Sequence, residues 1–281
     1  MTFNPVAAQN IIECKKIIKE KNPRAIDLGS QTPSLNNSFL DFLIKNNKFL
    51  DTLQINMINN LKKNQNFSTK DYFKSIGYKD YYSIDINGAY NSYKFDLNKD
   101  INDTYNFKES FDLVINNGTG EHVFNQYSLF LNLHNITNKG GLMLNILPFV
   151  DWVNHGFYNF NPIFFADLAA SNSYKILKIA LANRNGNEIV LKEADQNILF
   201  EQIKPHRAAT KFKNLLDFAK EKLGTNILLV VVTQKNSNDK FKIPLQGKYL
   251  EDISNFVNDY KDQNPGSANA ENQVPDNLKR K

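Results

Sequence analysis

Acidic, imidazole and amide side chains gather around one turn in the middle of the sequence. The stretch from Phe111 to Gln126 reads FDLVINNGTGEHVFNQ. It starts as an apolar strand, and small residues from Asn116 to Gly120 then break that strand. Glu121 and His122 follow the turn directly and open a predicted helix. These side chains can bind a ligand or move a proton, and a purely structural connection needs none of them.

Two histidines are candidate catalytic bases. His122 follows the turn, and its neutral imidazole could accept a proton near neutral pH. Alternatively, His122 forms a hydrogen bond with the backbone at the start of the helix. His155 lies in an aromatic loop after the next predicted strand, where Gly156 permits close backbone approach, or it is bonded locally within a folded loop. With Glu121, these histidines lack the spacing of a helical metal motif, and Cys14 is the only cysteine, so we predict no metal site.

Three acids stand at or near the ends of predicted strands, namely Asp27, Asp85 and Asp96. An acid that ends the second strand of a mononucleotide-binding unit accepts hydrogen bonds from ribose hydroxyls, and Asp85 has that position. Alternatively, Asp85 stabilises the following turn through its own side chain. The first predicted turn contains Gly29 but lacks the two further glycines of a dinucleotide-binding loop, which argues against NAD or FAD.

The elements that position these residues alternate between strand and helix along the chain. Apolar runs predict strands near residues 24–31, 81–86, 111–115, 142–147, 174–181, 188–191 and 226–233. Helical periodicity predicts helices near residues 6–21, 36–61, 67–78, 123–137, 163–173 and 208–223. This alternation predicts a three-layer, Rossmann-like α/β fold. Its seven-stranded sheet is mostly parallel, with one antiparallel strand from residues 226–233.

Length and charge set the outer limits of the interpretation. The 281 residues suffice for one core, so we predict a single domain over residues 1–262, which ends in a helical extension, and a disordered tail over residues 263–281. The net charge of +5 is mild and its lysines alternate with acids, which argues against a nucleic-acid partner. No apolar stretch has the length of a membrane span, so we predict a cytoplasmic protein without a membrane partner.

Four segments, taken in order, resemble the motifs of class I S-adenosylmethionine-dependent methyltransferases. They are AIDLGSQ at 25–31, SIDIN at 83–87, FDL at 95–97 and FDLVINNGTGEHV at 111–123. The KGGLML segment at 139–144 resembles the turn into the fifth strand of that family. The segment HGFYNFNP at 155–162 is similar to one in bacterial methyltransferase-like proteins. The resemblance extends from Arg24 to Thr233.

The resemblance implies a methyltransferase fold with S-adenosyl-L-methionine as cofactor. It assigns the ribose diol to Asp85 and the adenine amine to Asp96, and it places His122 and His155 toward the substrate. The full set of implied cofactor contacts is Asp27, Gly29, Gln31, Asp85, Ile86, Asp96, Leu97, Asn116, Asn117 and Gly118.

The expected acceptor of the methyl group is a small molecule or a carbohydrate. This expectation depends on the weak nucleic-acid signal and on the aromatic loop, whose rings can stack on a sugar. Two alternatives stay open. One is a member of the fold that binds cofactor without catalysis and has an interaction role. The other is an NAD-type oxidoreductase, against which the missing glycines argue.

Overall fold

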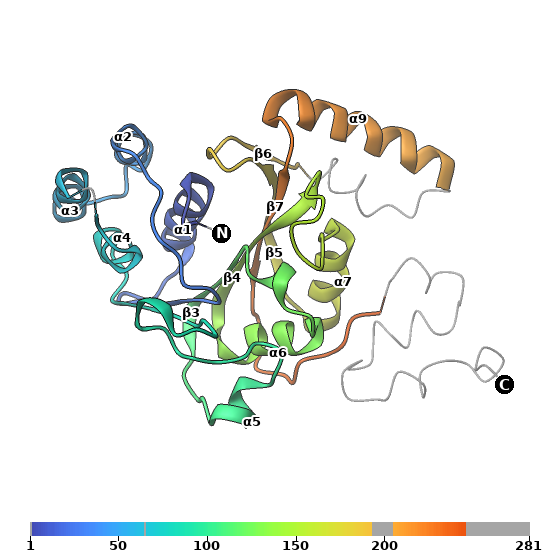
Figure 1. Cartoon of the computed structure of the whole chain (residues 1–281), viewed down its shortest axis with the longest axis horizontal. Helices are drawn as coiled ribbons and strands as arrows, with labels where there is room; N and C mark the ends of the chain where they lie inside the picture. Colours follow the sequence, from blue (N-terminus) through green and yellow to red (C-terminus); the bar gives the residue numbers. More distant parts are fainter. Residues whose placement is uncertain (1, 65, 193–204, 246–281) are drawn as a thin grey trace.

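Seven strands form one sheet in the order β2-β1-β3-β4-β7-β5-β6 (Figure 1). The computed structural model describes residues 2–64, 66–192 and 205–245, so the predicted boundary at residue 262 and the predicted tail lie outside the described residues. The strands are β1 (Arg24–Asp27), β2 (Asp80–Ser83), β3 (Phe111–Asn117), β4 (Thr137–Val150), β5 (Lys175–Ala182), β6 (Glu188–Val190) and β7 (Ile227–Gln234).

The predicted three-layer, Rossmann-like α/β fold with a mostly parallel sheet is confirmed. Strands β2, β1, β3 and β4 pair in parallel, and β7 runs antiparallel between β4 and β5 as predicted for residues 226–233. The structure adds a second antiparallel strand, because β6 pairs with β5 in a hairpin. The Asn183 carboxamide accepts bonds from the amides of Asn185 and Asn187, and Gly186 has a φ of +90°, which closes this hairpin.

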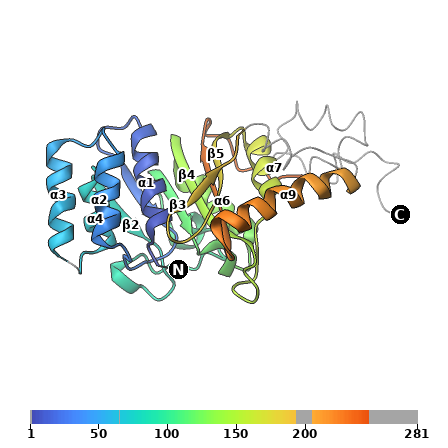
Figure 2. The ribbon, with the colours of Figure 1, turned by 90° about the horizontal axis from the view of Figure 1, so that it is seen from above.

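Helices cover both faces of the sheet (Figures 1 and 2). On one face, the hydrophobic cluster includes residues of α1 (Pro5–Ile17), α2 (Asn37–Asn46), α3 (Thr52–Lys63) and α4 (Thr69–Ser75). On the other, it includes residues of α5 (Ile101–Tyr105), α6 (Gln126–Ile136), α7 (Pro162–Asn172) and α9 (Pro205–Leu223). None of the described helices is long and apolar enough to cross a membrane.

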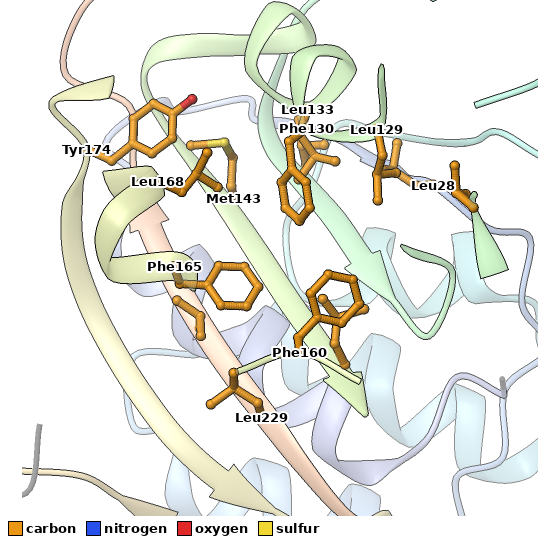
Figure 3. Packing of buried hydrophobic residues seen from close by; sticks show 14 of the residues in the cluster. Leu28, Leu129, Phe130, Leu133, Met143, Phe160, Phe165, Leu168, Tyr174 and Leu229 are labelled. Atoms are coloured by element: carbon orange, nitrogen blue, oxygen red, sulfur yellow. The ribbon is translucent and has the colours of Figure 1, made fainter. Parts of the chain in front are cut away.

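Alternation along the strands divides the apolar side chains between these two clusters. Leu113 and Ile115 belong to the cluster with α1 to α4, whereas Val114 between them belongs to the other. That second cluster brings together Phe130 of α6, Phe165 of α7 and Met143 of β4 (Figure 3). Burial on both faces explains why the central strands read as continuous apolar runs.

The connections between strands reverse direction at β1. From β1 the chain continues to β2 on one side, and it then crosses back to β3 on the other side. In open parallel sheets the carboxyl ends of strands at such a reversal form the crevice that binds ligands. The loops after β1 and β3 are therefore where a functional site is expected.

The segment after β3 differs from its prediction. A helix that opens with Glu121 and His122 was expected, but these residues belong to a short 3-10 turn, η2 (Gly120–His122). Helix α6 begins separately at Gln126, where the Asn125 side chain caps it by accepting a bond from the Ser128 amide at 3.1 Å. The break lets η2 take its own orientation at the end of β3.

Candidate functional site

A cleft of about 300 Å³ lies at the carboxyl ends of β1, β2 and β3. Its volume falls at the lower end of the range typical of small-molecule sites. It is lined by Leu28, Gly29, Ser30, Gln31, Asp85, Ile86, Phe95, Asp96, Leu97, Asn98, Gly118, Thr119, His122 and Val123. The fold thus brings predicted site residues from four separate segments to one cleft at the reversal of strand order.

Asp85 joins two loops of this cleft. One carboxylate oxygen accepts a hydrogen bond from the Ser30 amide at 3.3 Å, and the other accepts from the Asn87 amide at 3.2 Å. The second bond is the turn-stabilising role that was the alternative interpretation of Asp85. The carboxylate is half-buried and still borders the cleft, so turn formation and ligand contact are compatible at this residue.

Asp96 is held at the cleft by aromatic stacking. Just before the segment at 95–97, Tyr93 makes an isolated bridge to Ile84, and the chain turns directly after Asp96. Neighbouring rings of the stack have planes within 21° of each other, and the stack consists of Tyr82, Tyr93, Phe95 and Tyr105. The Asp96 amide donates to the Tyr105 hydroxyl at 3.0 Å. Hydrogen bonds from the Asn98 backbone and side chain lower the pKa of Asp96.

Asp27 lies beneath the cleft and does not line it. Its side chain is fully buried, and one oxygen accepts a bond from the Gly29 amide at 3.3 Å. Burial raises the pKa of Asp27 well above its usual value. Asp27 therefore shapes the β1 loop from below.

Asn116 and Asn117 are also fully buried, and their side chains connect the loops around the cleft. The Asn116 amide group donates to the Asn145 side chain at 3.0 Å, and its oxygen accepts from the Gly120 amide at 2.9 Å. Asn117 donates to the Gln31 side chain at 2.7 Å, and Gln31 donates back to the Asn117 carbonyl. These bonds fasten the end of β3 to β4, to η2 and to the β1 loop.

Glycines allow the β1 and β3 loops to approach each other. A Cβ at Gly29 would lie 2.3 Å from the Thr119 hydroxyl oxygen, so no larger residue fits there without movement. Gly118 has a φ of +65°, a conformation that favours glycine. Both glycines were predicted site residues, and both line the cleft.

The two histidines predicted as catalytic candidates meet at one carboxylate. Glu121 is fully buried, and neither of its oxygens has a hydrogen-bond partner among the described residues. The Glu121 Oε1 atom lies 3.8 Å from His122 Nε2 and 3.5 Å from His155 Nε2. The two imidazole rings contact each other, with centroids 5.1 Å apart. His122 lines the cleft, whereas His155 lies behind it on the loop after β4.

Backbone contacts hold that loop against η2. The Glu121 carbonyl accepts hydrogen bonds from the amides of Phe157 at 2.8 Å and Tyr158 at 3.3 Å. A Cβ at Gly156 would lie 2.9 Å from the same carbonyl oxygen, which confirms the predicted close backbone approach. The Trp152 ring packs on His155 with centroids 4.8 Å apart. His155 thus reaches Glu121 because its loop docks on η2.

Burial determines the protonation of this group. It raises the pKa of Glu121 to about 7. Burial also lowers the pKa of both His122 and His155. For His155, the charges of His122 and Arg184 lower the pKa further. Near neutral pH both imidazoles are therefore uncharged, and each has one nitrogen lone pair available for a proton or a metal ion.

The prediction of no metal site rested on spacing within one helix. That rule does not describe ligands from two segments, and Glu121 and His122 lie in η2 while His155 lies in the loop after β4. The carboxylate and imidazole ligand atoms of these three residues lie within 4.8 Å of one another. In the sequence, Gly156 beside His155 predicted a close backbone approach in this loop. It did not indicate that the approaching segment would be that of Glu121.

No protein-family model matches the sequence, and no curated protein matches it. Solved structures with a similar fold include TehB from Haemophilus influenzae, at 14% identity and a TM-score of 0.41. The match covers 81% of this chain, and the chain spans 62% of the length of that structure. Another is an O-methyltransferase of a Brevibacillus brevis polyketide synthase in complex with S-adenosyl-L-homocysteine, at 13% identity, a TM-score of 0.40 and coverage of 83% and 73%. A third is a SAM-dependent methyltransferase from Archaeoglobus fulgidus, at 10% identity, a TM-score of 0.40 and coverage of 81% and 92%.

Proposed function

We propose that the protein is an S-adenosylmethionine-dependent methyltransferase that acts on a small molecule or a carbohydrate. The observation that carries the proposal is the cleft at the reversal of strand order. Gly29, Asp85, Asp96 and Gly118 come from four segments whose motifs resemble those of class I methyltransferases, and all four line this one cleft. A chance resemblance of short motifs would not require them to converge.

The cleft residues suit the parts of this cofactor. The Asp85 carboxylate is positioned to accept bonds from ribose hydroxyls, and the Asp96 carboxylate to accept one from the adenine amine. The acceptor nucleophile then attacks the methyl carbon as the bond from that carbon to sulfur breaks. Such a transfer depends chiefly on holding the two reactants in line. His122, at the rim of the cleft, borders the space from which an acceptor would approach.

Exposed aromatic rings beside the histidines support a ring-shaped acceptor. The Phe124 side chain is 70% exposed and that of Phe157 is 67% exposed, although they contact each other edge to face at 5.9 Å. The Tyr158 hydroxyl donates to the Phe124 carbonyl at 2.9 Å, which ties the two loops together. Exposed rings on a fixed loop can stack on an apolar sugar or aromatic face.

A second candidate is a protein that binds the cofactor without catalysing transfer. Gln31 and Asn117 favour it, because their reciprocal hydrogen bonds fill the space between the β1 and β3 loops with side chains. A methyl donor must fit its amino-acid part beside these loops. Cofactor binding without turnover on any acceptor would support this candidate over the first.

Isothermal titration calorimetry with S-adenosylmethionine, S-adenosylhomocysteine and NAD tests the proposal. Either sulfur compound should bind and NAD should not. Asp85→Ala should weaken binding at least tenfold, since hydrogen bonds to charged groups contribute about 1.5–3 kcal/mol. Asp80→Ala is the matched control, because Asp80 lies at the amino end of β2, whereas the cleft lies at the carboxyl ends of the strands. If neither sulfur compound binds at millimolar concentration, the proposal is wrong.

A further inference from the structure

We propose that Glu121, His122 and His155 bind a divalent transition-metal ion of the zinc type beside the cleft. One carboxylate oxygen and two imidazole nitrogens form the donor set, and their ligand atoms lie within 4.8 Å of one another. Two imidazoles with one carboxylate form a common zinc-binding set and also suit other first-row transition metals. The cluster stands directly behind the cleft wall, because His122 belongs to both.

The unpaired state of the buried groups points to a missing ligand. Both Glu121 oxygens and the His155 Nε2 atom are buried and without a hydrogen-bond partner in the described part of the chain. A buried polar group without a partner destabilises the folded protein, and a charged group does so more strongly. A cation bound between the three side chains would give all of these atoms a partner. The contacts of Glu121 Oε1 with His155 Nε2 at 3.5 Å and with His122 Nε2 at 3.8 Å are too long to do so.

The spacing of the donors fits a tetrahedral ion. Zinc bonds of about 2.0–2.1 Å to nitrogen and oxygen place neighbouring donors about 3.3 Å apart in a tetrahedral site. The separations from Glu121 Oε1, 3.5 Å to His155 Nε2 and 3.8 Å to His122 Nε2, exceed this by a few tenths of an ångström, and all three ligand atoms lie within 4.8 Å of one another. Small rotations of the imidazole rings would close that difference. Hydrogen bonds from Phe157 and Tyr158 to the Glu121 carbonyl already fix the backbone on both sides.

Arg184 is the nearby cation that could otherwise neutralise Glu121. Its guanidinium stacks on the Trp152 ring, 4.8 Å from the ring centroid, and from there its charge opposes the burial that raises the pKa of Glu121. Within the described residues, the side chains that lie within 4.0 Å of the Glu121 Oε1 atom as ion-pair partners are the two imidazoles.

The consequence for chemistry rests on the proposed function. Three protein ligands leave at least one coordination position open, and His122 places that side of the cluster toward the cleft. A hydroxyl-bearing acceptor bound there would lose its proton to solvent more readily, because a metal ion lowers the pKa of bound oxygen. Its oxygen would form the bond to the methyl carbon while the carbon–sulfur electron pair passes to sulfur. The site therefore favours an oxygen acceptor.

Metal binding is tested on the full chain, stripped with a chelator and titrated with Zn²⁺ and Co²⁺. One equivalent should bind, and Co²⁺ should give the visible absorption of a tetrahedral site. Glu121→Gln and His155→Gln should each weaken binding at least tenfold, as loss of even an outer ligand partner does. Asp85→Ala should bind metal like the wild type while it binds the cofactor at least tenfold more weakly, and Glu121→Gln should bind the cofactor like the wild type.

The outcomes separate the two proposals. Metal binding without binding of either sulfur compound would leave the metal site standing and reject the methyltransferase. Cofactor binding with no stoichiometric metal, or metal binding that neither variant weakens, would overturn the metal site. Circular dichroism checks that each variant is folded, and His155→Gln, on a partly exposed side chain, provides the answer should Glu121→Gln fail to fold.

Discussion

Two histidine environments near helix α6 differ in whether their buried polar atoms are paired. His134, in α6, is 3% exposed, and both ring nitrogens have partners: the Tyr174 hydroxyl at 2.6 Å and the Asp239 carbonyl at 2.7 Å. Because a carbonyl only accepts, Nε2 donates to Asp239 and Nδ1 accepts from Tyr174. In the Glu121 cluster before α6, by contrast, the carboxylate has no hydrogen-bond donor among the described residues.

We interpret His134 as a structural histidine and the Glu121 cluster as the site of a ligand, as proposed above. His134 has a complete set of partners and needs no ligand, whereas the Glu121 cluster becomes complete only if a ligand supplies what its atoms lack. Burial alone does not separate the two cases, because Glu121 and His134 are both buried.

Removal of His134 should destabilise the protein far more than neutralisation of Glu121. His134→Ala leaves a cavity, takes the hydrogen-bond acceptor from the buried Tyr174 hydroxyl and takes the donor from the Asp239 carbonyl, so the free energy of unfolding should fall by about 3 kcal/mol. Glu121→Gln replaces an unpaired carboxylate by an amide of similar size and should cost nothing or stabilise slightly. Urea unfolding at pH 7.5 without metal measures both values. Equal losses in the two variants would contradict the comparison.

The pairing of His134 also predicts a pH dependence. Burial, and secondly Lys235, lower the pKa of His134 to about 4. As the pH falls through 6.5, His134 takes up a proton in the unfolded chain but not in the folded protein. Its contribution to the free energy of unfolding is therefore complete above that pH and is lost as the pH falls toward 4. Between pH 7.5 and 4.5 this residue should cost about 2 kcal/mol.

The measurement is a comparison of two slopes. Unfolding free energies of the wild type and of a folded His134→Gln variant are determined across this pH range, and their difference isolates the histidine from the carboxylates that also titrate. The difference should shrink toward acidic pH. A constant difference would show that the pKa of His134 is the same in the folded and the unfolded protein, and that the interpretation of its two hydrogen bonds is wrong.

The sequence allowed the sheet and most of the cleft to be predicted for a simple reason. Continuous apolar runs such as residues 111–115 and 226–233 mark strands buried on both faces, and strand order then fixes which loops share an edge. Gly29, Asp85 and Asp96 follow strand positions and therefore reached the cleft. The position of Asp96 was right although its segment is held by stacked rings and not by strand pairing.

The directions of side chains and the contacts between distant segments could not be predicted from the sequence. Asn116 and Asn117 were assigned to cofactor contact from their place at the end of β3, but their side chains turn inward to Asn145 and Gln31. The meeting of His155 with Glu121 depends on a loop docking on η2, a contact between segments that no local periodicity encodes. The assignment of His122 and His155 as catalytic residues stays a prediction.

The smallest effect tests whether that docking positions the proposed metal site. In Gly156→Ala the new Cβ would meet the Glu121 carbonyl oxygen at 2.9 Å, so the loop must shift by a few tenths of an ångström. Stability should fall by about 1 kcal/mol, as in mild overpacking, and metal affinity should fall with it because His155 moves with the loop. Gly140→Ala is the control: its φ of +82° adds backbone strain, but no atom lies within 4 Å of the new Cβ. It should lose about 1 kcal/mol of stability with unchanged metal affinity. If both variants bind metal like the wild type, the contact at Gly156 supports the loop without positioning His155.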